Sequence, residues 1–126
     1  MPSKEKAKKS IEKSKNLLEQ AKKSFNVNAF DSCLITGYQA IFLSARAVLL
    51  KDGYREKSHA CVARYLEEKY VKTGKLEMKW VDLFDRFRDL RHSDQYDVFF
   101  SATKKECEDI LRFGKIFIRK IEELLK

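Results

Sequence analysis

The stretch NAFDSCLITGYQAIFLSARAVLLKDG, residues 28–53, decides the fold class of this chain. Its large apolar side chains recur at three- and four-residue spacings, which is the period of one face of a helix. Asp31 falls in the first turn of the expected helix, and Asp52-Gly53 is a typical helix end. Because no other segment is as apolar, we expect this helix to lie at the centre of the fold.

Four further segments repeat apolar residues at helical spacing, and none alternates as a β-strand does. We expect long helices over about residues 3–25, 76–90 and 103–125, and a shorter, partly exposed helix over about 58–70. The connections are short, which makes successive helices antiparallel neighbours. The sequence therefore predicts one all-α domain over residues 1–126, an up-and-down antiparallel bundle of four long helices and one shorter helix.

Local signals mark several helix ends. Ser58 is a candidate N-cap for the short helix, and Thr73-Gly74 is a candidate stop. Thr103 and Glu106 have the spacing of a capping box at the start of the last helix. The polar run SDQYD, residues 93–97, breaks the apolar pattern, so we expect the fourth helix to end before it.

The chain is strongly basic, with 27 lysines and arginines against 19 acidic residues and a net charge of +8. Such an excess favours polyanionic partners. Much of it lies in the first helix, where lysines spread around the helix axis. We interpret these lysines as a solvated face, and a nucleic-acid groove is the alternative.

Several classes of site lack their sequence motifs. Cys33, Cys61 and Cys107 are widely separated and have no histidine at zinc-ligand spacing, so we interpret them as buried, small apolar side chains. There is no phosphate-cradling glycine loop, no nucleophile elbow and no paired-histidine motif. We therefore expect no metal and no cofactor.

The sequence also bears on localisation. No apolar run approaches the roughly 20 residues that span a bilayer, and the N-terminal MPSKEKAKKS lacks the apolar core of a signal peptide. We expect a cytoplasmic protein that has no membrane partner.

One connection is unusually apolar, because Val98, Phe99 and Phe100 follow Tyr96 closely. Such side chains need cover from water. They either fold back onto the bundle or pack across a subunit boundary, and both alternatives stay open.

The stretch RFRDLRHSDQYD, residues 86–97, gathers three arginines and His92 near a helix end. Together with GYQAIFLSARAVLLKDGYREKSHACV, residues 37–62, and a terminal helix containing Phe117 and Ile118, it resembles the HEPN domain family. The resemblance covers nearly the whole chain, and its nearest form is the small stand-alone HEPN protein. It implies a helical bundle that is often a homodimer, is frequently encoded with a minimal nucleotidyltransferase, and in many members is a metal-independent ribonuclease toxin.

The family's nuclease motif is an arginine followed after four to six residues by a histidine, near the dimer cleft. Aligning Arg91 with that arginine puts Tyr96 where the histidine is needed. A literal match pairs Arg86 with His92, but six residues along a helix place them on different faces, whereas Arg88 and His92 share a face. The resemblance therefore implies a nuclease motif that is degenerate in this chain.

Metal-free RNA cleavage needs a base for the 2′-hydroxyl proton and cations for the charge on the phosphorane. A tyrosine, with a pKa near 10, is a poor base. His92 replaces it only if the helix unwinds at Arg91; otherwise His92 interacts favourably with a helix C-terminus. The candidate catalytic residues are thus Arg91 and His92.

The candidate RNA- or nucleotide-binding residues are Arg88, Arg91, Tyr96 and Asp31, the last as a polar neighbour of the cleft or a helix-start residue. Arg86 and Arg88 have an alternative role as partners of Asp85 and Asp89 on the solvent face. His59 starts the third helix, which favours its neutral form, and we expect it to pack or hydrogen-bond between helices.

Three functions follow from these residues. We favour a homodimer that binds RNA or nucleotide and pairs with a minimal nucleotidyltransferase in a toxin–antitoxin-like module. The first alternative is an active metal-independent endoribonuclease toxin built on Arg91 and His92. The second is a non-catalytic helical adaptor.

Overall fold

The computed structural model describes residues 1–126 and contains helices but no strand. Four of the helices are long, as predicted. The elements in chain order are α1 (Lys4–Asn26), α2 (Phe30–Asp52), α3 (His59–Leu66), the π-helical segment η1 (Glu67–Val71), α4 (Met78–Tyr96) and α5 (Lys104–Leu124).

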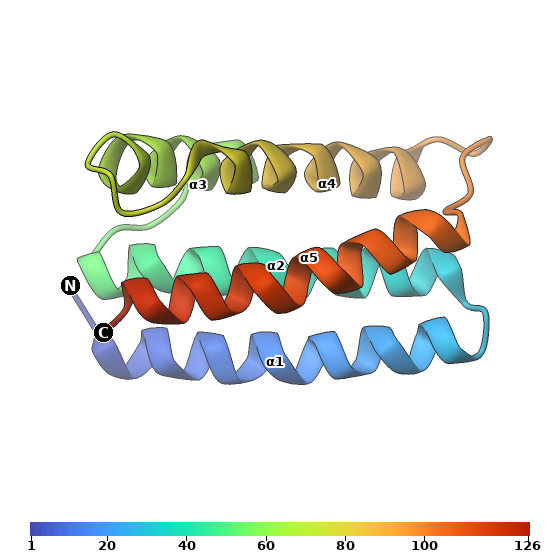
Figure 1. Cartoon of the computed structure of the whole chain (residues 1–126), viewed down its shortest axis with the longest axis horizontal. Coiled ribbons are helices and arrows are strands. Elements are labelled where there is room, and N and C mark those ends of the chain that lie inside the picture. Colours follow the sequence, from blue (N-terminus) through green and yellow to red (C-terminus); the bar gives the residue numbers. More distant parts are fainter.

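The helices form an antiparallel bundle with α2 and α5 in the middle layer (Figure 1). α1 lies on one side of this layer, and α3 and α4 lie on the other. Both termini are at one end of the bundle, and the α1–α2 and α4–α5 connections are at the opposite end (Figure 1). This arrangement confirms the predicted up-and-down bundle of four long helices and one shorter helix.

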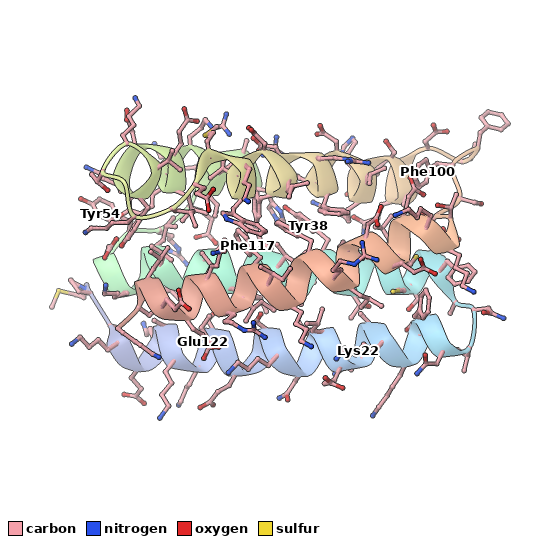
Figure 2. The ribbon with its side chains drawn as sticks, in the orientation of Figure 1. Lys22, Tyr38, Tyr54, Phe100, Phe117 and Glu122 are labelled. Carbon is pink, nitrogen blue, oxygen red and sulfur yellow. The ribbon has the colours of Figure 1, made fainter.

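The core lies around α2, in which aromatic and aliphatic side chains are buried on nearly every face. Figure 2 shows Tyr38 of α2 and Phe117 of α5 between the layers, whereas Lys22 lies on α1 and Glu122 lies on the side of α5 that faces α1. α1 packs closely on α2, and a hydrogen bond joins the two helices: the buried Ser14 hydroxyl donates to the Ala40 carbonyl oxygen at 2.7 Å. The predicted central position of this helix is confirmed.

By length and composition, α2 is the one helix apolar enough to cross a membrane. The expectation that no run approaches this length was wrong, because the few polar residues of α2 do not interrupt its apolar character. Most of its apolar window, 72%, is buried inside the bundle. A buried core helix satisfies the same criterion of length and composition, and α2 is buried as such a helix is.

Most predicted helix ends are confirmed. The Ser58 hydroxyl accepts a hydrogen bond from the Cys61 backbone N–H, and Thr103 and Glu106 form both halves of a capping box. Gly53 ends α2 in the left-handed region, with φ of 86°. Cys61 is exposed on α3, so the expectation that all three cysteines are buried holds only for Cys33 and Cys107.

The expected end of the fourth helix was wrong. α4 continues through the polar run and ends at Tyr96. Polar residues remove the apolar pattern without opposing helical geometry, because their side chains can face solvent. The chain turns only at Asp97, whose carboxylate accepts the backbone N–H of Phe99 at 3.0 Å.

The apolar residues that follow α4 differ in their cover: one folds back onto the bundle, and the other two remain exposed. Phe100 is half-buried and packs against the core. Val98 and Phe99 are 91% and 95% exposed. They form an apolar tip beside Tyr96, which is itself 69% exposed.

Candidate functional site

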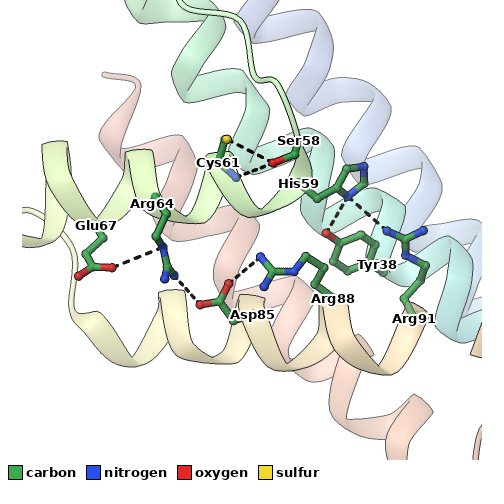
Figure 3. Close-up of polar contacts among 9 residues, drawn as sticks. All are labelled: Tyr38, Ser58, His59, Cys61, Arg64, Glu67, Asp85, Arg88 and Arg91. Carbon is green, nitrogen blue, oxygen red and sulfur yellow. Dashed lines mark hydrogen bonds and ion pairs between the residues drawn. The ribbon is translucent and has the colours of Figure 1, made fainter. Parts of the chain in front are cut away.

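Arg91 reaches from α4 into the angle between α2 and α3 (Figure 3). Its guanidinium carbon lies 4.9 Å from the centroid of the Tyr38 ring, which is a cation–π contact. Nη1 donates to Gln95 Oε1, and Nη2 lies 3.4 Å from His59 Nδ1. No carboxylate pairs with this arginine, and its Nε is buried without a hydrogen-bond partner. Arg91 therefore presents an unneutralised positive charge at a three-helix junction.

His59 is the first residue of α3, and its ring is held by two aromatic residues of α2. The ring stacks on Phe42 with centroids 3.8 Å apart and planes 10° apart. The Tyr38 hydroxyl lies 2.9 Å from His59 Nδ1. Phe42 and Tyr38 are four residues apart on one helix face, so α2 forms a rigid support for the imidazole. We call Tyr38, Phe42, His59, Arg91 and Gln95 the Arg91 cluster.

Burial lowers the pKa of His59, and the positive charges of Arg91 and Arg88 lower it further, against a smaller opposing effect of Glu56. The lowered pKa confirms the expectation that the neutral form of His59 is favoured. Burial, rather than the helix N-terminus, is the main cause.

The contacts also determine which nitrogen carries the proton. A guanidinium only donates, and burial raises the pKa of Tyr38 to about 12, so its hydroxyl remains protonated. Two donors thus converge on Nδ1, which must accept, and the single proton of neutral His59 sits on Nε2. In Figure 3 this second nitrogen is turned away from Tyr38 and Arg91. His59 is consequently a hydrogen-bond donor toward the outside of the cluster.

Arg88 lies one turn before Arg91 but is largely neutralised. Its Nη1 is 2.8 Å from Asp85 Oδ1, an ion pair rather than a directed hydrogen bond, because the N–H does not point at the oxygen. Asp85 also accepts from Arg64 Nη2 at 2.6 Å (Figure 3). The predicted pairing of Arg88 with Asp85 is confirmed, whereas Arg86 forms no ion pair.

His92 and Tyr96 occupy a different face of α4. Their ring centroids are 4.7 Å apart, and both side chains are exposed. Adjacent residues on a helix point about 100° apart, and α4 is continuous through this region, so the break that would turn His92 toward Arg91 is not present. The side chain one turn beyond Arg91 that contacts it is Gln95.

Asp31 lies at the start of α2, away from the Arg91 cluster. One of its oxygens accepts the Ala102 backbone N–H at 2.7 Å, so it fixes the α4–α5 connection. Asp94 is its neighbour on α4, and burial together with Asp31 raises the pKa of Asp94 to about 7. No group of three or more histidine, cysteine or acidic side chains is placed to hold a metal ion.

The structure thus brings Arg91 together with residues that were not predicted as site residues. Tyr38 and Phe42 have the spacing of core aromatics, and that pattern does not indicate that they also support a histidine and an arginine. Gln95 had one usable signal, its four-residue spacing from Arg91. Arg88, Tyr96, His92 and Asp31 remain separate from the guanidinium.

Comparison with known proteins gives a consistent family. The family model described as "HEPN domain" matches residues 7–124. A "UPF0332 protein" of Archaeoglobus fulgidus is 30% identical over 110 residues, which cover 87% of each chain.

Two proteins of Methanocaldococcus jannaschii are also similar. "Putative toxin MJ0142" is 26% identical over 91% of this chain and 78% of its own length. "Putative toxin MJ0605" is 28% identical over 92% of this chain and 86% of its own length. The family match extends across all five α-helices, including those that carry the Arg91 cluster. The chain therefore belongs to the HEPN domain family.

Proposed function

We propose that this toxin-like HEPN protein binds RNA or nucleotide phosphate through Arg91, acts as a homodimer and pairs with a minimal nucleotidyltransferase. The single observation that carries the binding proposal is the unpaired guanidinium of Arg91. Its Nε has no partner, and no carboxylate neutralises it. A phosphate group would supply the missing negative charge to this guanidinium.

The rest of the Arg91 cluster supports binding more than catalysis. His59 Nδ1 is occupied by two donors, so it is not free to take the proton of a 2′-hydroxyl. Its Nε2–H can donate to a phosphate oxygen. His92, the other histidine, lies on a different face of α4 from Arg91. An endoribonuclease toxin is therefore the less favoured alternative, and an adaptor without nucleic-acid binding leaves the unpaired guanidinium unexplained.

The binding proposal is tested by measuring RNA affinity of an Arg91→Ala variant. The probe is a fluorescent single-stranded oligoribonucleotide, followed by anisotropy at two salt concentrations. Loss of a charge-assisted contact of about 1.5 kcal/mol or more predicts an affinity loss of at least about tenfold. Arg91→Lys should recover only part of the loss, because an ammonium cannot bind a phosphate with two parallel N–H groups.

Arg86→Ala is the matched control. Arg86 is an exposed arginine on the same helix and forms no ion pair, so its loss changes the net charge equally. The proposal fails if Arg91→Ala and Arg86→Ala bind RNA alike. Cleavage of the probe by the purified wild-type protein in the presence of a chelator would instead support the endoribonuclease alternative.

The partner proposal rests on kinship with stand-alone HEPN proteins. It is tested by co-expressing the chain with any small nucleotidyltransferase encoded beside it and purifying through a tag on one protein. Recovery of both in a fixed ratio through size-exclusion chromatography is the expected result. Separation of the two proteins at micromolar concentration would remove the partner from the proposal.

A further inference from the structure

A second basic surface lies between α1, α2 and the α2–α3 connection. These segments line an open groove of about 670 Å³. Its basic residues come from all three segments, and we call this surface the α1 groove: Lys6, Lys9, Lys13, Arg46 and Arg55. The sequence pattern favoured a solvated face for the lysines of α1, but three of them share one wall of a concave site.

The α1 groove carries an uncompensated positive charge. Glu56 is the only acidic residue that lines it, and it pairs with Arg46 at 2.7 Å. Lys9 lies 3.5 Å from Glu5, but both side chains are more than 70% exposed, so this pair is weak. The other three basic side chains form no ion pair, and all are exposed: Lys6, Lys13 and Arg55.

The α1 groove borders the Arg91 cluster. Arg46 lies one helical turn beyond Phe42 on α2, and Phe42 stacks on His59. The α2–α3 connection that forms a wall of the groove leads directly into His59 at the start of α3. The carboxylate of Glu56 also acts on His59 and raises its pKa, although burial, Arg91 and Arg88 lower that pKa more. The α2–α3 connection therefore links the α1 groove to the Arg91 cluster along the chain.

An aromatic side chain accompanies the charges. Tyr54 lines the α1 groove and is 55% exposed, and only one aromatic neighbour, the tilted ring of Tyr65, packs near it. Cationic grooves with exposed aromatic rings are typical of sites for single-stranded nucleic acid, where bases stack on the rings and cations follow the backbone.

We propose that the α1 groove binds the sugar–phosphate backbone of single-stranded RNA and extends the contact made by Arg91. This inference rests on the proposed RNA binding and adds a second contact surface to it. Lys6, Lys13 and Arg55 neutralise successive phosphates, and Tyr54 offers a surface for one base. An anionic membrane is the competing polyanionic partner. Membrane surfaces favour a convex face with exposed apolar side chains, whereas this groove is concave and Met1 is its exposed aliphatic side chain.

The test uses the full chain and a variant that removes the three free charges, Lys6→Gln/Lys13→Gln/Arg55→Gln. A matched control, Lys23→Gln/Lys69→Gln/Lys115→Gln, removes three exposed charges that form no ion pair and lie outside the groove. The probe is a labelled oligouridylate of about twelve nucleotides, which is long enough to contact both the α1 groove and Arg91, with a tetranucleotide as the short comparison. Circular dichroism melting checks that both variants keep the wild-type fold.

The groove variant should bind the longer probe at least about tenfold more weakly than the control variant. The slope of log affinity against log salt should fall in magnitude by about two, because each lost contact to a single strand contributes about 0.7. Binding of the tetranucleotide should change little. Equal affinity and equal salt slope for the two variants would overturn the inference. Binding to vesicles that contain phosphatidylglycerol is measured in parallel, and the inference also fails if the groove variant loses affinity for these vesicles but not for RNA.

Arg91→Ala separates this inference from the proposed function. If only Arg91→Ala weakens binding, the α1 groove is not an RNA surface and the proposed function stands. If only the groove variant weakens binding, the groove inference stands and the role of Arg91 fails. If the wild-type protein binds neither probe, both are refuted.

Discussion

The Tyr38 hydroxyl lies 2.9 Å from Nδ1 of His59 and connects the central helix to the start of α3. Arg91 approaches the same nitrogen, so both donors compete with any proton on Nδ1. The consequence is a histidine that is neutral, fixed in orientation and protonated on Nε2. A fixed donor next to an unpaired guanidinium suits recognition of a phosphate, whereas catalysis of RNA cleavage requires a free base.

The first prediction concerns the protonation of His59. NMR correlations between the ring protons and nitrogens should identify the Nε2–H tautomer at neutral pH, with a pKa below the ordinary value of 6.5. Arg91→Ala removes a nearby positive charge and should raise that pKa. Arg86→Ala, which removes an arginine that does not contact His59, should leave it unchanged. A proton on Nδ1 would contradict the assigned donor and acceptor roles.

The second prediction concerns Asp94, whose pKa is about 7 in the folded protein against 3.8 for an ordinary aspartate. The folded state therefore holds this proton more tightly than the unfolded state, and its stabilising effect is lost as pH rises from about 4 through 7. Asp94→Asn replaces the carboxyl group with an amide that cannot ionise, and so removes the cost of ionisation next to Asp31. The variant should have a higher melting temperature than wild type at pH 8 and a similar one at pH 5.

Asp89→Asn is the control for this effect. Asp89 is exposed on the same helix and forms no ion pair, so it tests the change in net charge alone. Equal melting temperatures of Asp94→Asn and wild type at pH 8 would show that ionisation of Asp94 does not destabilise the fold.

Most of the fold could be predicted because its signals are local. Apolar periodicity identified each helix, and caps such as Ser58 and the Thr103–Glu106 box act within one turn of chain. The end of α4 was misplaced because residues 93–96 are polar on a helix that continues into solvent. The π-helical segment η1 was also missed, because apolar spacing does not distinguish a π-helical turn from an α-helical one. The hydrogen bonds that Asp52 of α2 accepts from Tyr65 and Tyr70 join distant segments, and no local pattern reveals them.

The candidate site was less predictable, since its contacts join three helices. Arg91 was identified from its place in a family-like stretch. Its neighbours Tyr38 and Phe42 have core spacing, and periodicity cannot distinguish a ring in the core from a ring that also faces a cation. His92 was chosen because an imidazole is a suitable base, on the condition that the helix unwinds at Arg91. α4 is continuous there, and adjacent residues on a helix point about 100° apart. Four-residue spacing would have indicated Gln95.

The third prediction concerns Gly53 and Gly74, which both have positive φ, 86° and 79°. A β-carbon at Gly53 would lie 2.8 Å from Pro2 Cδ, whereas one at Gly74 would meet nothing within 4 Å. Gly74→Ala should cost about 1 kcal/mol of unfolding free energy from backbone strain alone. Gly53→Ala should cost more in urea denaturation, because the N-terminal segment must also shift. Equal costs would show that the N-terminal segment moves away from the added β-carbon without loss of stability.

The fourth prediction concerns the proposed homodimer. Val98 and Phe99 are almost fully exposed, which is unfavourable for large apolar side chains unless another chain covers them. In a two-fold interface each substitution appears twice, and residues near the axis face their own copies. If the apolar tip forms the proposed interface near its axis, Phe99→Asp places two like charges opposite each other. Analytical ultracentrifugation should then show a monomer for the variant and a dimer for the wild type.

Val27→Asp is the matched control, because Val27 is an apolar residue, 74% exposed, in the α1–α2 connection. If the apolar tip forms the interface, Val27→Asp should leave the dimer intact, since it adds the same charge at a different exposed apolar position. Both variants should melt as the wild-type fold does in circular dichroism, because neither side chain contributes to the core. A wild-type protein that sediments as a monomer would refute the dimer, and a dimeric Phe99→Asp variant would place the interface elsewhere.

Because Arg91 and the apolar tip both belong to the C-terminal part of α4 and its connection, a dimer formed there would bring two Arg91 clusters toward one RNA. Loss of the dimer should then weaken RNA binding as well.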